Sequence, residues 1–91
     1  MINDVKVFKL ITGEEVIARV EQKNTMFILD RPMLLSTILN QQGIANSSLA
    51  PWIMSGKNEK ITISVDHVIA EDDPQAGIEK NYLAIVTGLS L

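Results

Sequence analysis

The sequence predicts an all-β domain, a small antiparallel barrel or sandwich of about five short strands, followed by a C-terminal α-helix. Two observations support this fold class. Short runs of alternating apolar residues recur between turn signals over residues 1–71, and helical spacing replaces the alternation over residues 73–88. The 91 residues, 46% of them hydrophobic, predict one folded domain, 1–91, with a single small core.

The first two strands are expected to form a hairpin. Residues 5–11, "VKVFKLI", are β-prone and are followed by "TGEE", where Gly13 is free to take a positive φ. Residues 16–21, "VIARVE", place Val16, Ala18 and Val20 on one face, as in a half-buried strand. A short connection therefore joins two antiparallel strands.

The middle of the chain contains further short strands. "MFIL" at 26–29 is a third strand or the continuation of a bent second one, and Pro32 suits a strand edge or a strand start. "MLLSTIL" at 33–39 is also a strand, although its periodicity leaves a helical turn open. Residues 40–48, "NQQGIANSS", are expected to form a mobile loop, and "LAPWIM" at 49–54 a further strand.

The stretch "ITISVDHVIA" at 61–70 carries an ionisable pair in its middle. Ile61, Ile63 and Val65 alternate as in a strand, and a second apolar run follows Asp66 and His67 without a linker. The apolar pattern alone does not explain why a strand would carry an ionisable pair in its middle and then continue.

The last segment has the pattern of a helix over 73–88. Asp73 suits the N-cap, Pro74 the first turn and Gly88 the C-cap. Apolar or aromatic residues recur at helical spacing, at Ile78, Tyr82, Ile85 and Leu89. The acids at 71–73 could alternatively bind a divalent cation, but capping accounts for them without a metal.

Composition excludes several functional classes. The chain has no cysteine, so disulfides, thiolate catalysis and cysteine zinc sites are excluded. Its N-terminal segment lacks the apolar core of a signal peptide, and no run reaches the roughly 18 apolar residues of a membrane span, so we expect a cytoplasmic protein with no membrane partner. The net charge of −3 disfavours non-specific duplex binding. No nucleophile with a partnered base is present, so we expect no catalytic residue, no metal and no cofactor.

The two strand patterns resemble the motifs of Sm and Sm-like (LSm) proteins, which are small, strongly bent five-stranded barrels. Their second motif is an apolar strand, then Arg-Gly-x-Asn, then another apolar strand, and "ITI-SVDH-VIA" fits this layout without a gap. The resemblance therefore implies two strands joined by a sharp turn at Ser64–His67. In the first motif, Gly13 corresponds to the turn glycine, Ala18 to a small strand position, and Asn24 stands where the family usually has Asp. "TGEEVIARV", "RPMLL", "PWIM" and "DHVIAEDDP…YLAIVTGL" further resemble Sm-like proteins of tailed phages of marine cyanobacteria.

The resemblance implies a homo-oligomeric ring that binds single-stranded RNA and influences RNA turnover, in the cytoplasm of an infected bacterium if the phage origin holds. Sm barrels pair their edge strands with the next subunit, closing roughly five to eight copies into a ring and removing unpaired edges. The implied RNA contacts are Lys23, Asn24, Ser64, Asp66 and His67.

The chain departs from the RNA-binding members at the base pocket. The Asn of the first motif and the Arg of the second, which hold a flipped-out base there, are replaced by Ile28 and Ser64, and the motif glycine is Val65. Serine provides fewer hydrogen bonds than arginine and no stacking plane. The usual N-terminal helix is also missing, and the predicted helix lies at the C-terminus.

Each candidate residue also has a structural explanation. His67 and Asp66 could be turn residues, Trp52 could pack in the core or stack on a base, and Lys57 and Lys60 could contact phosphate or be solvated. The net charge of −3 and the missing arginine of the second motif favour an alternative function, a structural or adaptor ring with protein partners and no nucleic acid.

Overall fold

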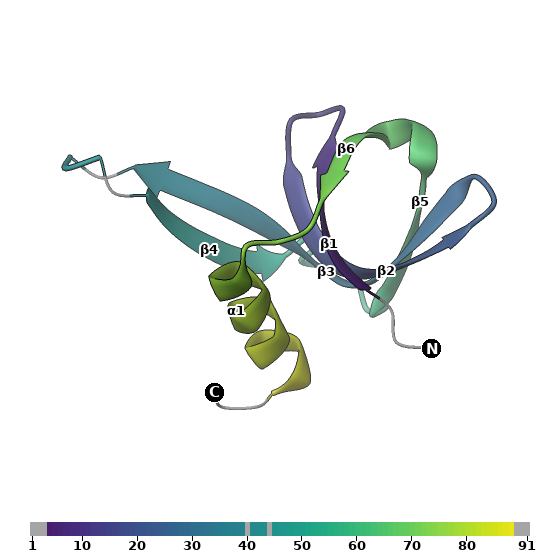
Figure 1. The fold of residues 1–91 in the computed structure, drawn as a ribbon. Coiled ribbons are helices and arrows are strands. Elements are labelled where there is room, and N and C mark those ends of the chain that lie inside the picture. The colour runs from purple at the N-terminus through teal and green to yellow at the C-terminus, as the bar shows by residue number, and fades with distance from the viewer. Residues whose placement is uncertain (1–3, 40, 44, 89–91) are drawn as a thin grey trace.

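The computed structural model describes residues 4–39, 41–43 and 45–88. One six-stranded antiparallel sheet curls into a bent, open barrel, and a C-terminal helix packs beside it (Figure 1). The elements in chain order are β1 (Asp4–Leu10), β2 (Glu15–Lys23), β3 (Met26–Leu39), β4 (Ala45–Pro51), β5 (Lys60–Ser64), a 3-10 turn η1 (Val65–His67), β6 (Val68–Asp72) and α1 (Ala76–Thr87). The predicted fold class is confirmed, with six strands where five were expected.

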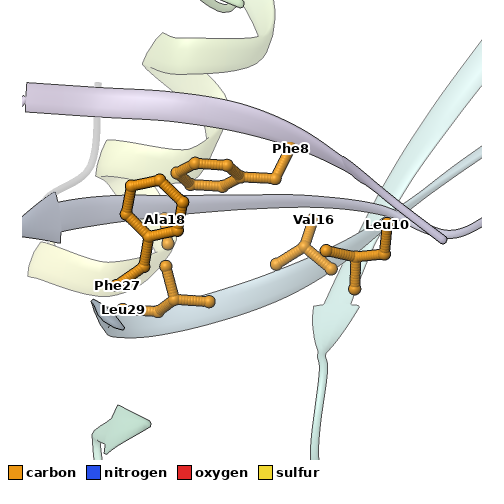
Figure 2. Close-up of a cluster of buried hydrophobic side chains, with 6 residues drawn as sticks. All are labelled: Phe8, Leu10, Val16, Ala18, Phe27 and Leu29. Carbon is orange, nitrogen blue, oxygen red and sulfur yellow. The ribbon is translucent and has the colours of Figure 1, made fainter. Parts of the chain in front are cut away.

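The barrel core lies between the first three strands. β1 and β2 form the predicted hairpin, with Val7 opposite Ile17 and Gly13 at a φ of 94° in the turn. Six buried apolar side chains from these strands meet inside the curl of the sheet, and the Phe8 and Phe27 rings lie 5.1 Å apart (Figure 2). A fully buried side chain of this kind contributes roughly 1.5–3 kcal/mol to stability.

A β-bulge bends β3 in its middle. Ile17 lies opposite Met33 and Arg19 opposite Asp30, so β3 has one more residue than β2 across this step. Arg31 takes a φ of 51°, and a positive φ is rarely adopted by a residue with a side chain. The bend lets the first half of β3 pair with β5 while its second half pairs with β4.

Residues 52–59 leave the sheet at this bend, between β4 and β5. The chain departs after Pro51, where the Trp52 amide donates to the Pro32 carbonyl at 3.1 Å. It returns just before β5, where the Arg31 amide donates to the Glu59 carbonyl at 2.6 Å. Trp52 was predicted to lie in a strand at 49–54, but β4 ends at Pro51 and Trp52 belongs to the loop. β4 and β5 both pair with β3 and are separated by this loop.

The helix α1 covers the outer face of the sheet and forms a second core. Tyr82 and Val86 on α1 pack against Ile17 and Met33. Because the sheet is covered on both faces here, Val16, Ile17 and Ala18 are all buried, so the alternation expected of β2 is lost at these residues. Of the expected helix face, Tyr82 is buried and Ile78 half-buried, Ile85 is 46% exposed, and Leu89 lies outside the described residues.

Other boundaries differ from the prediction. The helix begins at Ala76, not at residue 73, and its N-cap is Gln75, which makes no side-chain capping bond. Asp73 instead pairs with Lys6 at 2.6 Å, so capping does not explain the acids. Gly88 is the predicted C-cap, at a φ of 70°. β6 runs to Asp72, one residue past the predicted end of the barrel, and β4 begins within the predicted loop at 40–48, of which residues 40 and 44 lie outside the described part.

Candidate functional site

Three connections gather on one side of the barrel. They are the β1–β2 turn at 11–14, the β2–β3 turn at 24–25 and the 3-10 turn η1, which lies between the other two (Figure 1). η1 is the sharp junction predicted between the two strands of the second motif. All five candidate RNA-contacting residues lie in or beside these connections: Lys23, Asn24, Ser64, Asp66 and His67.

The β2–β3 turn and the start of η1 are held directly together. The Val65 amide donates to the Thr25 carbonyl at 2.9 Å, and Ser64 lies opposite Met26 in the β3–β5 ladder. Asn24 occupies the turn at a φ of 54°, a left-handed conformation that asparagine tolerates well. The structure therefore brings Asn24 and Ser64 to the same end of the barrel.

The Ser64 side chain caps the 3-10 turn η1. Its Oγ accepts a hydrogen bond from the Asp66 amide at 3.3 Å, which makes Ser64 the N-cap of η1. Ser64 is half-buried, whereas Asp66 is exposed. A ligand here would meet the Asp66 carboxylate more readily than the Ser64 hydroxyl.

His67 lies at the other end of η1. Its carbonyl accepts from the Ile11 amide at 2.9 Å, which ties η1 to the β1–β2 turn. A cavity of about 210 Å³ opens here, with His67 and Trp52 in its lining together with Leu10, Ile11 and Ile63. His67 is thus separated from Asn24 by the length of η1, and it shares an almost wholly apolar cavity with the one tryptophan of the chain.

The side of the barrel with these three connections, the loop end, has no excess of positive charge, because Asp66 and Glu14 offset Lys23. Lys23 and Asn24 are exposed on one connection, and Asp66 is exposed on the next. Lys6 lies apart from them, where its hydrogen bond to the Asp73 carboxylate raises the pKa of Lys6 above the ordinary value. Over residues 4–39, 41–43 and 45–88, no three His, Asp or Glu side chains gather as a metal site would need, and no helix is long and apolar enough to cross a membrane.

Two strand edges are unpaired on either side of a gap in the barrel. In the described part of the chain, β5 pairs with β3 alone and β6 with β1 alone. The wall of the cavity at this gap includes Phe27, Val65 and Ile69, and Ile69 is 63% exposed. Lys57 and Lys60 stand before and at the start of β5, and Glu71 and Asp72 at the end of β6.

Ile28 and Ser64 are the two residues that the resemblance assigns to the base pocket of RNA-binding Sm rings. Ile28 is half-buried in β3, opposite Thr62 of β5. Ile28 has no hydrogen-bonding group in its side chain, and Ser64 uses its hydroxyl as a cap. These two side chains do not form the hydrogen-bonding pocket that an Asn and an Arg would make.

Sequence reasoning missed the cavity between Trp52 and His67. Its formation depends on residues 52–59 leaving the sheet at the bend of β3, which no local pattern signals. The one weak signal in the sequence is Ile11, an isoleucine directly before a polar turn. In the structure it is 58% exposed and lines this cavity.

The comparison with protein families agrees with the bent sheet and the two motifs. The model of the Sm_like domain matches residues 7–82, from β1 into α1. No curated protein matches the chain. The matched region covers most of the chain, including the first-motif hairpin, the β5–η1–β6 junction and the buried Tyr82. The chain therefore belongs to the Sm_like domain family.

Proposed function

We propose that this chain assembles head to tail into a closed homo-oligomeric ring that binds single-stranded RNA along its loop end. The observation that carries the proposal is the pair of unpaired edges, β5 and β6, on either side of the gap in the barrel. An unpaired edge exposes a row of backbone donors and acceptors, and a ring in which β6 of one copy pairs with β5 of the next removes both edges at once.

The charges on the two edges complement each other. Lys60 begins β5, whereas Asp72 ends β6. If the two strands align antiparallel over their full length, Asp72 of one copy lies beside Lys60 of the next, and Glu71 lies beside Ile61. A parallel alignment would place Asp72 beside Ser64. The charges therefore favour antiparallel pairing, with exposed Ile69 covered by the neighbouring copy.

RNA binding follows from repetition of a weak site around the ring. Each copy would present Lys23 to a phosphate and Asn24 to a base edge, with Ser64 and Asp66 beside them. A base stacked in the cavity of Trp52 and His67 would add affinity without selecting a sequence. Several copies acting on one strand can raise the overall affinity well above that of one site.

The altered base pocket limits what the ring would recognise. With Ile28 and Ser64 in place of Asn and Arg, we expect little preference for uridine and an affinity that depends strongly on salt. We infer a non-enzymatic role in RNA turnover, with no cofactor. The resemblance to proteins of cyanobacterial tailed phages supports a phage origin and action in the cytoplasm of the infected host.

Titration of the purified protein with short fluorescein-labelled single-stranded RNA tests this function. Fluorescence anisotropy reports binding, and quenching of Trp52, the one tryptophan, reports whether a base enters the cavity. Lys23→Ala should weaken binding several-fold at low salt. Lys80→Ala on the exposed side of α1 is the matched control and should leave the affinity unchanged. Absence of binding at low salt, or equal losses in both variants, would overturn the RNA proposal.

A second function, an adaptor ring for protein partners, is favoured by one groove. A cavity of about 570 Å³ lies between the end of α1, the bend of β3 and the loop at 52–59. Exposed Ile53 and Ile85 contribute to its lining, and the net charge of −3 also suits a partner other than RNA. A ring that takes up no RNA in the titration above would favour this function.

A further inference from the structure

The β3–β4 hairpin projects from the barrel as a two-stranded arm. β2 pairs with β3 only as far as Leu35. Beyond this point the arm consists of two strands alone, β3 from Ser36 to Leu39 and β4 from Ala45 to Ser48 (Figure 1). Ser36, Thr37, Ser47 and Ser48 are all exposed. An isolated two-stranded hairpin is marginally stable in water, so an arm of this kind gains from pairing with a further strand.

The outer edge of β4 lacks the usual protection against such pairing. Natural edge strands carry charged side chains, prolines or bulges that prevent another strand from docking. No Asp, Glu, Lys or Arg occurs between Arg31 and Lys57. The register of β4 against β3 runs without a bulge from Met33↔Pro51 to Leu39↔Ala45, and the one proline of β4 stands at its very end.

We propose that β4 pairs antiparallel with β4 of a second copy of this chain across a two-fold axis, and that these contacts join two rings face to face. In a two-fold contact the strand meets its own sequence running in the opposite direction, so a charge near the axis would face the same charge of the second copy. A strand without charges avoids this repulsion, and for that reason a second copy fits this edge.

The polar side chains of the arm suit the contact. The hydroxyls of Thr37 and Ser47 already approach to 3.3 Å across the two strands of the arm. Serine and threonine form such cross-strand contacts readily, and β4 would offer the same groups to the partner strand. With the two strands fully overlapped, Ser48 at the centre of β4 lies opposite Ser48 of the second copy.

The pairing of β4 does not depend on the ring, whereas the double ring rests on the proposed function. β4 lies on the opposite flank of the loop at 52–59 from β5, which is the edge assigned to ring closure. Arm pairing would turn a ring into a double ring, and would turn a monomer into a dimer.

Native mass spectrometry of charge variants tests the pairing. Ser48→Lys and Ser48→Asp should each halve the mass of the wild-type assembly, because like charges then face each other at the axis. Mixing the two variants should restore the full mass, since Lys then faces Asp. Ser36→Lys is the matched control. Ser36 lies opposite Ser48 within the arm but is separated by β4 from the second copy, so the assembly of this variant should keep the wild-type mass.

The outcomes separate this inference from the proposed function. A wild-type ring whose mass Ser48→Lys leaves unchanged would overturn arm pairing and keep the ring. A wild-type dimer that Ser48→Lys converts to a monomer would support arm pairing and contradict the ring. Halving by the single variants without restoration in the mixture would also overturn the two-fold contact.

Discussion

The hydroxyl of Tyr82 donates a hydrogen bond to the carbonyl of Asp30 at 2.8 Å, which joins the C-terminal helix to the bend of β3. The same oxygen accepts from the Arg19 amide at 3.2 Å, on the neighbouring strand. The Arg31 guanidinium completes the junction by donating to the Val86 carbonyl near the end of α1. One aromatic side chain thus fixes the helix at the bulge that shapes the barrel.

Tyr82→Phe should therefore destabilise the fold although it removes a single oxygen atom. It leaves the Arg19 amide without its hydroxyl partner at a part-buried site, a cost of about 1–3 kcal/mol. Urea unfolding measures this loss. Ile85→Ala on the same helix is the control, because Ile85 is 46% exposed and should lose much less. Equal losses in the two variants would mean that the hydroxyl does not anchor the helix.

Alkaline pH should weaken the same contact. Burial raises the pKa of Tyr82 above its ordinary value of 10.0, because the phenolate is poorly solvated there. The neutral hydroxyl stabilises the fold fully below pH 10, and this contribution is lost as the pH rises through the higher folded-state pKa. Tyr82 is the one tyrosine, so absorbance of the phenolate near 295 nm follows it directly.

The midpoint of that titration should lie above 10 in the folded protein and return to about 10 in urea. A folded-state midpoint at or below 10 would contradict the burial of this hydroxyl. Tyr82→Phe should remove the corresponding loss of stability above pH 10.

Asn24 allows the turn and the proposed RNA contact to be separated. At a φ of 54°, Asn24→Gly should keep or slightly raise stability, whereas Asn24→Val should cost about 1–2 kcal/mol because a β-branched residue is strained there. Both variants should bind RNA more weakly, because both lack the amide. Thermal unfolding and RNA anisotropy on the same samples check the two effects. A Gly variant that binds RNA as the wild type does would remove Asn24 from the interface.

The charges at the two edges should govern assembly. Lys60→Glu places a carboxylate against Asp72 of the neighbouring copy, so the single variant should dissociate at lower protein concentration. The double variant Lys60→Glu/Asp72→Lys restores opposite charges and should reassemble. Sedimentation velocity at low salt measures both, and high salt should reduce the difference. An unaffected single variant would indicate that these residues do not meet.

The sequence predicted those parts of the fold that local patterns determine. Alternation and Gly13 sufficed for the first hairpin, whereas the β5–η1–β6 junction followed from the resemblance of "ITI-SVDH-VIA" to the second Sm motif. The course of β3 was missed, because the runs at 26–29 and 33–39 form one strand that bends at the bulge at Arg31, whereas "DRP" was interpreted as a break between strands. The helix start was misplaced because Asp73 pairs with Lys6, far away in the sequence.

The candidate site divides in the same way. The resemblance to the Sm motifs singled out Asn24 and Ser64, and the Val65–Thr25 hydrogen bond holds the two connections that carry them together. The cavity that joins Trp52 to His67 could not be predicted, since it is formed by three segments distant in the chain. Both the start of the helix and this cavity depend on contacts between residues far apart in the sequence, which a local pattern does not reveal.

Disulfide cross-linking tests the head-to-tail contact most directly, because the chain has no cysteine of its own. In the antiparallel alignment, Thr62 at the centre of β5 lies opposite Ala70 at the centre of β6 of the next copy, close enough for a disulfide. On oxidation, Thr62→Cys/Ala70→Cys should give a ladder of covalent oligomers that ends at the subunit number of the ring, while either single variant stays monomeric on a non-reducing gel. A double variant that remains monomeric after oxidation would contradict assembly through these two edges.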